Sequence, residues 1–228
     1  MYKYFSERKF AQEFLEGKIL FRSLGYFRDY EDREIRRDEH EGTAIYRPPG
    51  GLVGTNHTQG TSFVLPGWSF QSLAKWEEIL VFCLSRALSK RLCEQFEAVA
   101  CVEIDDIGAF CRRVEAALPA SAVFPGPVGH TRIGRRIDYY EESEGGSPRW
   151  AVPDLIATSK PRRYAWQREF RLVFSLTDAL AFENVSTRLV QEPFIETLPA
   201  TAHQSYLVET QSLRDICRLY ECQETRDT

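Results

Sequence analysis

Hydrophobic and polar positions change period several times along the chain, and each change predicts an element of the fold. Alternating or short apolar runs predict strands over residues 2–5, 19–23, 79–85, 98–104 and 168–175. The run at 79–85 is apolar almost throughout, which is typical of a strand buried on both faces. Apolar residues at helical spacing predict a helix over about 7–16, with Ser6 as its N-cap and Gly17 as its C-terminal stop. The chain is therefore predicted to open with a strand–helix–strand unit.

Polar and turn-forming residues separate the regular segments. Asp105 or Asp106 is predicted to cap a second helix that ends near Leu118. Residues 28–60 are charged and then rich in Gly, Pro, Thr and Asn, which predicts a long loop or insertion. Less regular patterns predict a strand or aromatic-rich loop at 61–72, weak strands at 135–141 and 187–195, and turn-rich stretches at 120–134 and 143–153.

The C-terminal part is predicted to end in a helix. It would follow the short run Tyr206–Glu209, with Ser212 and Asp215 as its capping box. Strands outnumber helices, and no repeated strand–helix–strand rhythm indicates a parallel sheet. We therefore predict a single α+β domain over residues 1–228, with a mostly antiparallel sheet and peripheral helices.

Composition narrows the class of protein. The 228 residues are 43% hydrophobic and 13% aromatic, as in an ordinary globular protein with a real core. No apolar run approaches the roughly 20 residues of a membrane span, and the N-terminus lacks the apolar core of a signal peptide. The six cysteines include no Cys-x-x-Cys pair, which favours a reduced, cytoplasmic protein. The four histidines are scattered, so we expect no metal site.

Charge is distributed unevenly. The net charge of −4 argues against indiscriminate coating of nucleic acid, and acidic residues concentrate at 31–41 and 141–144. Two basic runs with aromatic neighbours suit a surface that binds phosphates and bases, although charged runs are more often simply solvated faces. The runs are Arg132, Arg135 and Arg136, and Lys160, Arg162, Arg163, Arg168 and Arg171.

The second basic run leads directly into the strand at 168–175. In an extended chain residues i and i+2 point to the same face, so Gln167 and Glu169 would project together while Arg168 points away. A carboxylate beside a carboxamide can fix a ribose and stabilise a nearby positive charge. The plainer alternative is a strand with ordinary polar residues at its exposed end.

Three segments in this order resemble a widespread bacterial domain family of unknown function. They are the N-terminal strand–helix–strand unit together with 27–32, the run Val81-Phe82-Cys83-Leu84-Ser85, and residues 160–173 with their Trp-x-x-Glu-x-Arg core. The same layout is similar to that of ADP-ribosyltransferases, including bacterial toxins that modify nucleic acids. This resemblance implies a split sheet of the ADP-ribosyltransferase type.

The resemblance also implies a set of catalytic residues. Glu169 would be the catalytic glutamate of a Gln-x-Glu turn, Gln167 would position the acceptor, and Ser85 would orient the ribose or the glutamate. NAD would be the substrate, and no metal is implied. Arg22 is the candidate for the strand arginine, with Tyr4 or Lys3 as replacements for the histidine of another subclass.

Further residues would bind the two substrates. Tyr4, Phe21 or Tyr26 would stack on the nicotinamide, and Trp166 would hold the acceptor. The basic loop with Arg162 and Arg163 favours RNA or DNA as that acceptor over protein. A bacterial toxin or phage-defence enzyme of this kind would also need an antitoxin or chaperone partner.

Two other functions stay open at this point. The domain could be a non-catalytic nucleic-acid-binding or adaptor domain that keeps the fold, or it could be a nuclease-type toxin. The individual residues also have plain interpretations, since Ser85 could simply end a buried strand and Arg22 could lie on a surface.

Overall fold

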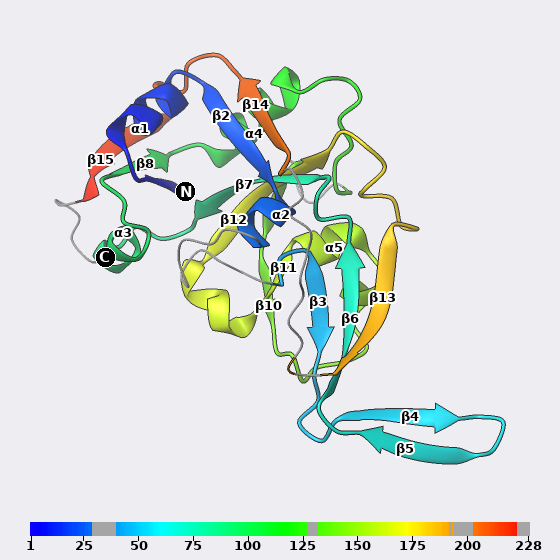
Figure 1. Cartoon of the computed structure of the whole chain (residues 1–228). Coiled ribbons are helices and arrows are strands. Elements are labelled where there is room, and N and C mark those ends of the chain that lie inside the picture. The colour runs from blue at the N-terminus through cyan, green and yellow to red at the C-terminus, as the bar shows by residue number, and fades with distance from the viewer. Residues whose placement is uncertain (29–39, 127–131, 192, 194–202, 223–228) are drawn as a thin grey trace.

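The computed structural model describes residues 1–28, 40–126, 132–191, 193 and 203–222 (Figure 1). The helices are α1 Arg8–Leu15, α2 Leu24–Arg28, α3 Lys90–Gln95, α4 Ile107–Ala117 and α5 Pro153–Ala157, with 3₁₀ turns η1 Pro148–Trp150 and η2 Arg162–Gln167. The first strands are β1 Tyr2–Phe5, β2 Lys18–Ser23, β3 Thr43–Tyr46, β4 Leu52–Asn56, β5 Thr61–Leu65, β6 Trp68–Ala74, β7 Ile79–Ser85 and β8 Ala100–Ile104. The later strands are β9 Gly134–Arg136, β10 Asp138–Tyr140, β11 Ser159–Pro161, β12 Glu169–Ser175, β13 Val185–Gln191, β14 Ser205–Glu209 and β15 Cys217–Glu221.

The main sheet has the strand order β14-β2-β7-β1-β8-β15, and β12 pairs with both β7 and β9. Every pairing in this sheet is antiparallel, while β10 and β11 form a short parallel pair. β13, β6 and β3 form a separate antiparallel sheet. The prediction of a mixed fold with a mostly antiparallel sheet is confirmed.

Strand β7 is the centre of the main sheet. One of its edges pairs with β12 along the full length of β7. Its other edge pairs with β2 through Val81 and Leu80, and with β1 through Ser85. β1 and β2 therefore share one edge of β7. β1 contacts β7 only at Ser85, which lies opposite Glu169 of β12 on the other edge.

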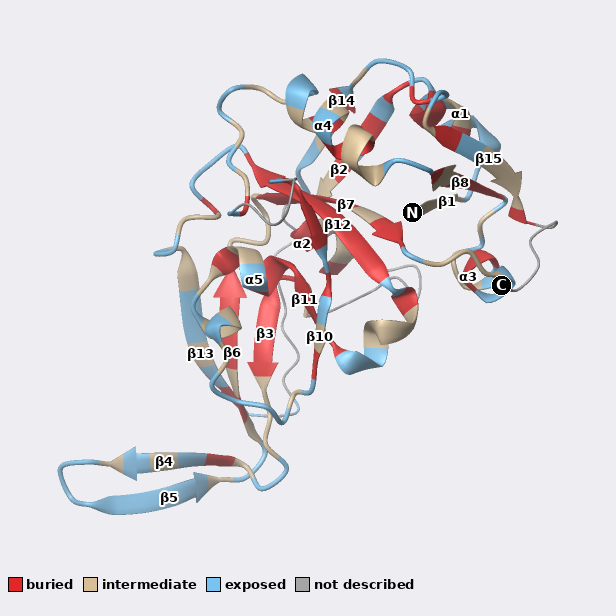
Figure 2. Cartoon of the chain, turned by 180° about the vertical axis from the view of Figure 1, so that it is seen from behind, coloured by how far each residue is buried: buried red, intermediate tan, exposed pale blue. Residues whose placement is uncertain are grey.

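The apolar character of β7 follows from burial on both faces (Figure 2). Leu80, Phe82 and Leu84 enter the larger core under α1 and α4, which also holds the rings of Phe14 and Phe110. The alternate residues of the strand enter a second core with Leu24, Ile156 and Val173. This alternation confirms the prediction of a strand buried on both faces.

Helix α1 begins later than its predicted cap. Glu7, not Ser6, occupies the N-cap position, and its side chain makes no capping hydrogen bond. Asp106, in contrast, caps α4 as predicted, because its carboxylate accepts a hydrogen bond from the backbone N–H of Ala109 at 2.8 Å. The helix still lies where the sequence predicted it, because Phe14 and Leu15 pack in the core.

Gly17 ends α1 in a conformation that other residues rarely adopt. We expect Gly17→Ala to lower the free energy of unfolding by at least about 1–2 kcal/mol. Its φ is +97°, and an added Cβ would lie 2.4 Å from the carbonyl oxygen of Thr210. Urea unfolding measures the loss, and Gly50→Ala is the control, since a Cβ there meets nothing within 4 Å. Equal stability of the two variants would contradict the prediction.

The segment 28–60, predicted as a long loop or insertion, contains regular structure, so the loop alternative is wrong for part of it. Residues 43–46 form β3, and β4 begins a hairpin with β5, while 29–39 lie outside the described residues. The hairpin projects as a ribbon from the body of the molecule (Figure 1). Its turn is closed by Asn56, whose Oδ1 accepts hydrogen bonds from the backbone N–H groups of Thr58 and Gln59. Gly and Asn marked this turn, but not the strands beside it.

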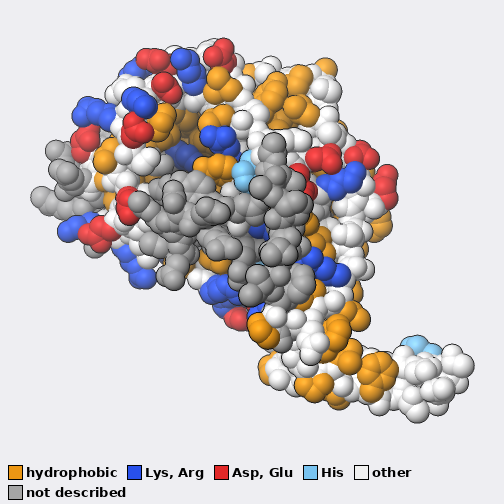
Figure 3. Space-filling view, in the orientation of Figure 1, with side chains coloured by type: hydrophobic (Ala, Val, Ile, Leu, Met, Phe, Trp, Pro, Cys, Tyr) orange, Lys and Arg blue, Asp and Glu red, His pale blue; other side chains and the backbone are white. Residues whose placement is uncertain are grey.

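The hairpin carries no charged side chain and exposes several apolar ones. No Lys, Arg, Asp or Glu occurs between residues 48 and 74. Val53, Phe63 and Val64 are 69%, 51% and 54% exposed, and hydrophobic side chains follow the ribbon in Figure 3. The ring of Phe63 lies across Gly54, where an added Cβ would be 2.5 Å from it. β4 and β5 pair only with each other among the described strands.

The predicted C-terminal helix is wrong. Residues 203–222 form strands β14 and β15 and contain no α-helix. The carboxylate of Asp215 is not part of a capping box, because it pairs with Arg113 of α4. Two further differences are smaller. Helix α5 was not predicted, and it begins at Pro153, the last residue of the stretch predicted as turns. Strand β13 begins at Val185 rather than Thr187. Residues 192, 194 and 195 lie outside the described part of the chain.

The cysteines do not all remain as free thiols. Cys93 of α3 and Cys222 after β15 form a disulfide that spans 129 residues of sequence. Cys83, Cys101, Cys111 and Cys217 are free. The composition argument for a fully reduced protein therefore fails for one pair. In the described residues, no helix has both the length and the apolar character needed to cross a membrane.

Candidate functional site

A cavity of about 240 Å³ lies where β1, β7 and β12 meet. Its lining combines apolar and aromatic side chains with charged and amide groups. Its lining includes Tyr2, Lys3, Tyr4, Phe5, Ser6, Phe10, Phe27, Glu41, Cys83, Leu84, Ser85, Phe96, Lys160, Gln167, Glu169 and Arg171. Such a mixture of an apolar wall and a few converging polar groups is typical of ligand sites.

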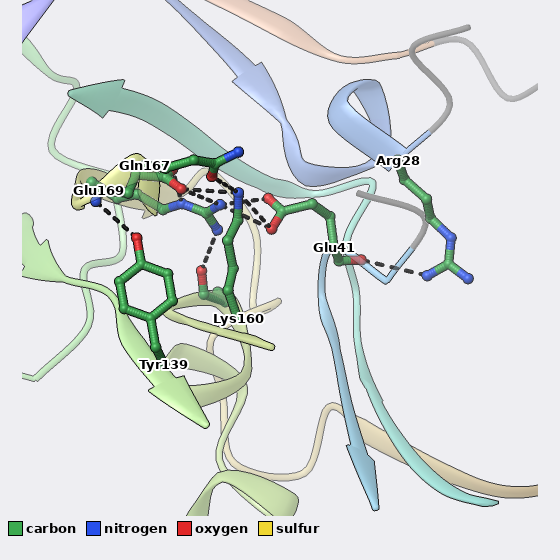
Figure 4. Close-up of polar contacts among 8 residues, drawn as sticks. Arg28, Glu41, Tyr139, Lys160, Gln167 and Glu169 are labelled. Atoms are coloured by element: carbon green, nitrogen blue, oxygen red, sulfur yellow. Dashed lines mark hydrogen bonds and ion pairs between the residues drawn. The ribbon is translucent and has the colours of Figure 1, made fainter. Parts of the chain in front are cut away.

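Four buried charges form the polar floor of this cavity, and we call them the charge cluster (Figure 4). They are Glu41, Lys160, Glu169 and Arg171, none of which is more than 6% exposed. Arg171 Nε donates to Glu169 Oε1 at 2.5 Å, and its Nη2 donates to both oxygens of Glu41 at 2.9 and 2.7 Å. Lys160 Nζ lies 2.9 Å from Glu169 Oε2 and 3.6 Å from Glu41 Oε1. Two carboxylates thus balance two cations.

Glu41 reaches the cluster from a tight turn before β3. Thr43 closes this turn by donating its backbone N–H to the carbonyl of His40 at 2.8 Å. The guanidinium of Arg28 donates to the Glu41 carbonyl at 3.4 Å (Figure 4). It also donates to Thr43 Oγ1 at 3.1 Å. Gly42 allows the close packing, since an added Cβ would lie 2.7 Å from Cβ of Trp76. These contacts direct the Glu41 carboxylate into the cavity.

The turn into β12 places Gln167 and Glu169 together by a route other than the predicted extended chain. Gln167 ends the 3₁₀ turn η2, and Arg168 follows in the left-handed conformation, with φ 47° and ψ 45°. Ser85 Oγ donates to the Gln167 carbonyl at 2.9 Å, and the Glu169 N–H donates to the Tyr139 hydroxyl at 2.8 Å. Lys160 Nζ then joins the two side chains, since it also donates to Gln167 Oε1 at 3.0 Å. A left-handed non-glycine residue held by such contacts is typical of functional turns.

The charge cluster keeps Glu169 ionised. Burial by itself raises the pKa of Glu169, but the positive charges of Arg171 and Lys160 outweigh burial, and the pKa lies well below its ordinary range. Burial likewise opposes the charged form of Arg171, yet the carboxylates of Glu169 and Glu41 raise its pKa well above the usual value. Burial, with the charge of Glu169, raises the pKa of Cys83 to about 12. Cys83 is therefore a neutral thiol rather than a nucleophile at neutral pH.

This electrostatic arrangement predicts a loss of stability in acid. The folded-state pKa of Glu169 lies below its ordinary value of 4.5, so below that pH the unfolded chain takes up a proton that the folded chain refuses. The stabilisation from Glu169 is complete above pH 4.5 and decreases as the pH falls further. Urea unfolding between pH 7 and pH 3 should show a steeper loss for the wild type than for Glu169→Gln. Parallel curves for the two proteins would rule out this contribution.

The structure brings five of the expected site residues to the cavity. Glu169, Gln167, Ser85, Tyr4 and Lys3 all line it. The Tyr4 hydroxyl donates to the Ala87 carbonyl at 2.8 Å and accepts from the Ser89 N–H at 3.2 Å, so its ring is held against the cavity wall.

The expected nicotinamide-binding residues of β2 and α2 lie elsewhere. The guanidinium of Arg22 lies over the ring of Tyr26, 4.8 Å from its centre, and neither residue lines the cavity. Phe21 is fully buried in the larger core, against Phe82 and Phe174. A side chain without exposed surface cannot stack on a ligand, so the expectation for Phe21 is corrected.

The expected acceptor-binding residues lie on η2, outside the cavity lining. Arg162 pairs with Glu141 at 2.7 Å, and Arg163 pairs with Glu142. The acidic run at 141–144 thus neutralises part of the basic loop, which the sequence alone did not show. The Trp166 ring lies 6.0 Å from that of Phe96, and Phe96 lines the cavity.

Sequence reasoning missed the role of three members of the charge cluster. Lys160 and Arg171 were read only as parts of a basic surface run, although both are buried. One signal was present, because Arg171 follows Glu169 at i+2 and must share its face in a strand that is otherwise apolar. No local signal marked Glu41, which stands 130 residues before Arg171.

Comparisons with known proteins identify no related protein. The chain matches no protein-family model, no curated protein and no solved structure. The described residues also contain no group of three or more His, Cys, Asp or Glu side chains that could hold a metal ion.

Proposed function

We propose that this protein is an NAD-dependent mono-ADP-ribosyltransferase of the bacterial toxin or phage-defence type. The observation that carries the proposal is the ionised Glu169 carboxylate on the floor of a cavity, directly opposite Ser85 in the register of β12 and β7. The resemblance of three ordered segments to such enzymes supports the same assignment. The fold would then be the split-sheet type of this class.

The cavity suits the nicotinamide-ribose end of NAD. Ligand pockets commonly have volumes of about 300–1,000 Å³. A cavity of about 240 Å³ therefore accepts the reacting end, while the rest of the dinucleotide would lie outside it. The rings of Tyr4 and Phe96 line the cavity and supply aromatic surface against which nicotinamide can pack.

The chemistry uses the carboxylate without a covalent bond to the enzyme. The bond between the ribose C1′ and the nicotinamide nitrogen breaks, and nicotinamide leaves with the electron pair. Glu169 would accept a hydrogen bond from the ribose 2′-hydroxyl and stabilise the positive charge that develops on the sugar. The acceptor then bonds to C1′ and loses its proton to solvent. Ser85 would hold the turn, and Gln167 would orient the acceptor.

The acceptor proposed here is a base of RNA or DNA. Gln167 rather than a second glutamate at this turn favours an amide or base acceptor, by the same resemblance. The ion pairs of Arg162 and Arg163 leave less net positive charge on the neighbouring loop than the sequence suggested. An antitoxin or chaperone that restrains the enzyme in its own cell also belongs to this proposal.

One observation favours a second candidate. Glu169 is held by two cations, as in a charge cluster that only stabilises a fold. The alternative is a non-catalytic nucleic-acid-binding or adaptor domain in which the cavity has no substrate. A nuclease receives less support, given the absence of a metal-binding group in the described part of the chain.

Labelled NAD separates these candidates. The protein is incubated with NAD carrying label in its adenine, in the presence of separate RNA, DNA and protein pools. Transfer of label to the RNA or DNA pool, with release of nicotinamide, is the expected result. Transfer to the protein pool would keep the enzyme and change its acceptor. No binding and no consumption of NAD with any pool would reject the transferase.

A further inference from the structure

Lys160 lies among three acceptors at the floor of the cavity (Figure 4). Its Nζ contacts Glu169 Oε2 at 2.9 Å and Gln167 Oε1 at 3.0 Å, and it lies 3.6 Å from Glu41 Oε1. A buried ammonium is costly unless a carboxylate compensates its charge. Lys160 has two carboxylates within reach, so it can lose one and keep the other.

Arg171 cannot exchange partners in the same way. It is 1% exposed, and its guanidinium donates to both carboxylates of the cluster and to the Ala157 carbonyl at 2.8 Å. The planar guanidinium is fixed by acceptors on several of its edges. Lysine instead carries a compact charge at the end of a flexible stem. Lys160 is therefore the mobile cation of the cluster, and Arg171 is the fixed one.

Any ligand that engages Glu169 has to compete with Lys160. The carboxylate accepts from Arg171 through Oε1 at 2.5 Å and through Oε2 at 3.3 Å, and Lys160 lies 2.9 Å from Oε2. A ribose hydroxyl or a positively charged ring that binds Glu169 would compete with these donors for its two oxygens. The ammonium must then move, and a shift toward Glu41 keeps it paired within the buried site.

We propose that Lys160 is a positioning residue that passes from Glu169 to Glu41 when a ligand engages Glu169. Glu41 then has two tasks, since it is the counter-charge of Arg171 and the receiver of Lys160. No proton is transferred, and all four groups keep their charge. This inference rests on the proposed function, in which the entering group is the nicotinamide-ribose end of NAD.

Steady-state kinetics with NAD test the exchange through the KM for NAD, which is determined separately from kcat. Glu41→Gln removes the receiving carboxylate, so Lys160 should stay on Glu169 and the KM for NAD should rise about tenfold, the worth of one hydrogen bond to a charged group. Adding Lys160→Met to this variant removes the competing cation. The double variant should therefore return KM close to the wild-type value. Circular dichroism and urea unfolding establish that each variant is folded.

A third variant keeps the net charge of the cluster. Lys160→Arg places a planar, bidentate donor against Glu169, so KM should rise about tenfold here as well. If Glu41→Gln does not fold, Lys160→Arg provides the test of the exchange instead. An unchanged KM in either single variant overturns the exchange, and so does a folded double variant whose KM is no closer to the wild type. A wild type that does not use NAD rejects the proposed function together with this inference, whereas an active wild type with unchanged variants rejects the exchange alone.

Discussion

Arg171→Leu is expected to lower the free energy of unfolding by about 3–5 kcal/mol, the usual cost of removing one partner from a buried ion pair. Arg171 is 1% exposed and pairs with both Glu169 and Glu41. Without it, Lys160 alone faces two buried carboxylates, which must take up a proton or admit water. Urea unfolding at pH 7 measures the loss.

A surface arginine provides the matched control. The Arg8 side chain is 62% exposed and pairs with Glu221 at 2.6 Å. Exposed ion pairs of this kind contribute about 0–1 kcal/mol, so Arg8→Leu should leave the unfolding curve almost unchanged. If the two substitutions cost the same, the charge cluster does not stabilise the fold in the way that its burial indicates.

Glu169→Gln is expected to lower the rate of ADP-ribosyl transfer by at least about 100-fold, as for loss of one transition-state charge contact. The amide keeps the shape of the side chain but cannot stabilise the positive charge that develops on the ribose. The loss should therefore appear in kcat more than in KM. Initial rates with labelled NAD and the preferred nucleic-acid pool measure both quantities.

The control for this experiment is Glu141→Gln. Glu141 lies close in sequence to the basic loop and pairs with Arg162, but its side chain is 47% exposed and does not line the cavity. Its transfer rate should stay near that of the wild type. A folded Glu169→Gln protein that retains most of its transfer activity would remove Glu169 from the mechanism.

The sequence predicted those strands and helices whose own apolar pattern shows which faces are buried. β7 and β12 are apolar because both of their faces are covered, and α1 and α4 carry apolar stripes toward one core. β4 was missed because exposed strands need no alternation of apolar and polar residues, whereas β5 lies in the stretch 61–72 that was left open between a strand and a loop. β15 was mistaken for a helix because its pairing with β8 comes from a distant part of the chain.

In the candidate site, the residues that are neighbours in sequence could be predicted, and the distant one could not. Gln167 and Glu169 are neighbours in sequence, so their convergence could be predicted, although the left-handed Arg168 could not. Glu41 joins them only through the turn before β3, and nothing near position 41 indicates a partner 130 residues later. Arg22 was chosen by strand position, and the structure shows it against Tyr26 instead.

The two ends of the strand order β14-β2-β7-β1-β8-β15 are strands that follow all the other described strands in the sequence. β14 pairs with β2 at one edge, and β15 pairs with β8 at the other. A chain that has been synthesised only to residue 202, or that has been clipped there, leaves the hydrogen-bonding groups of β2 and β8 open at the same time. Open strand edges recruit other chains and favour aggregation. Pairing of β14 with β2 and of β15 with β8 therefore closes two strand edges that would otherwise be open to other chains.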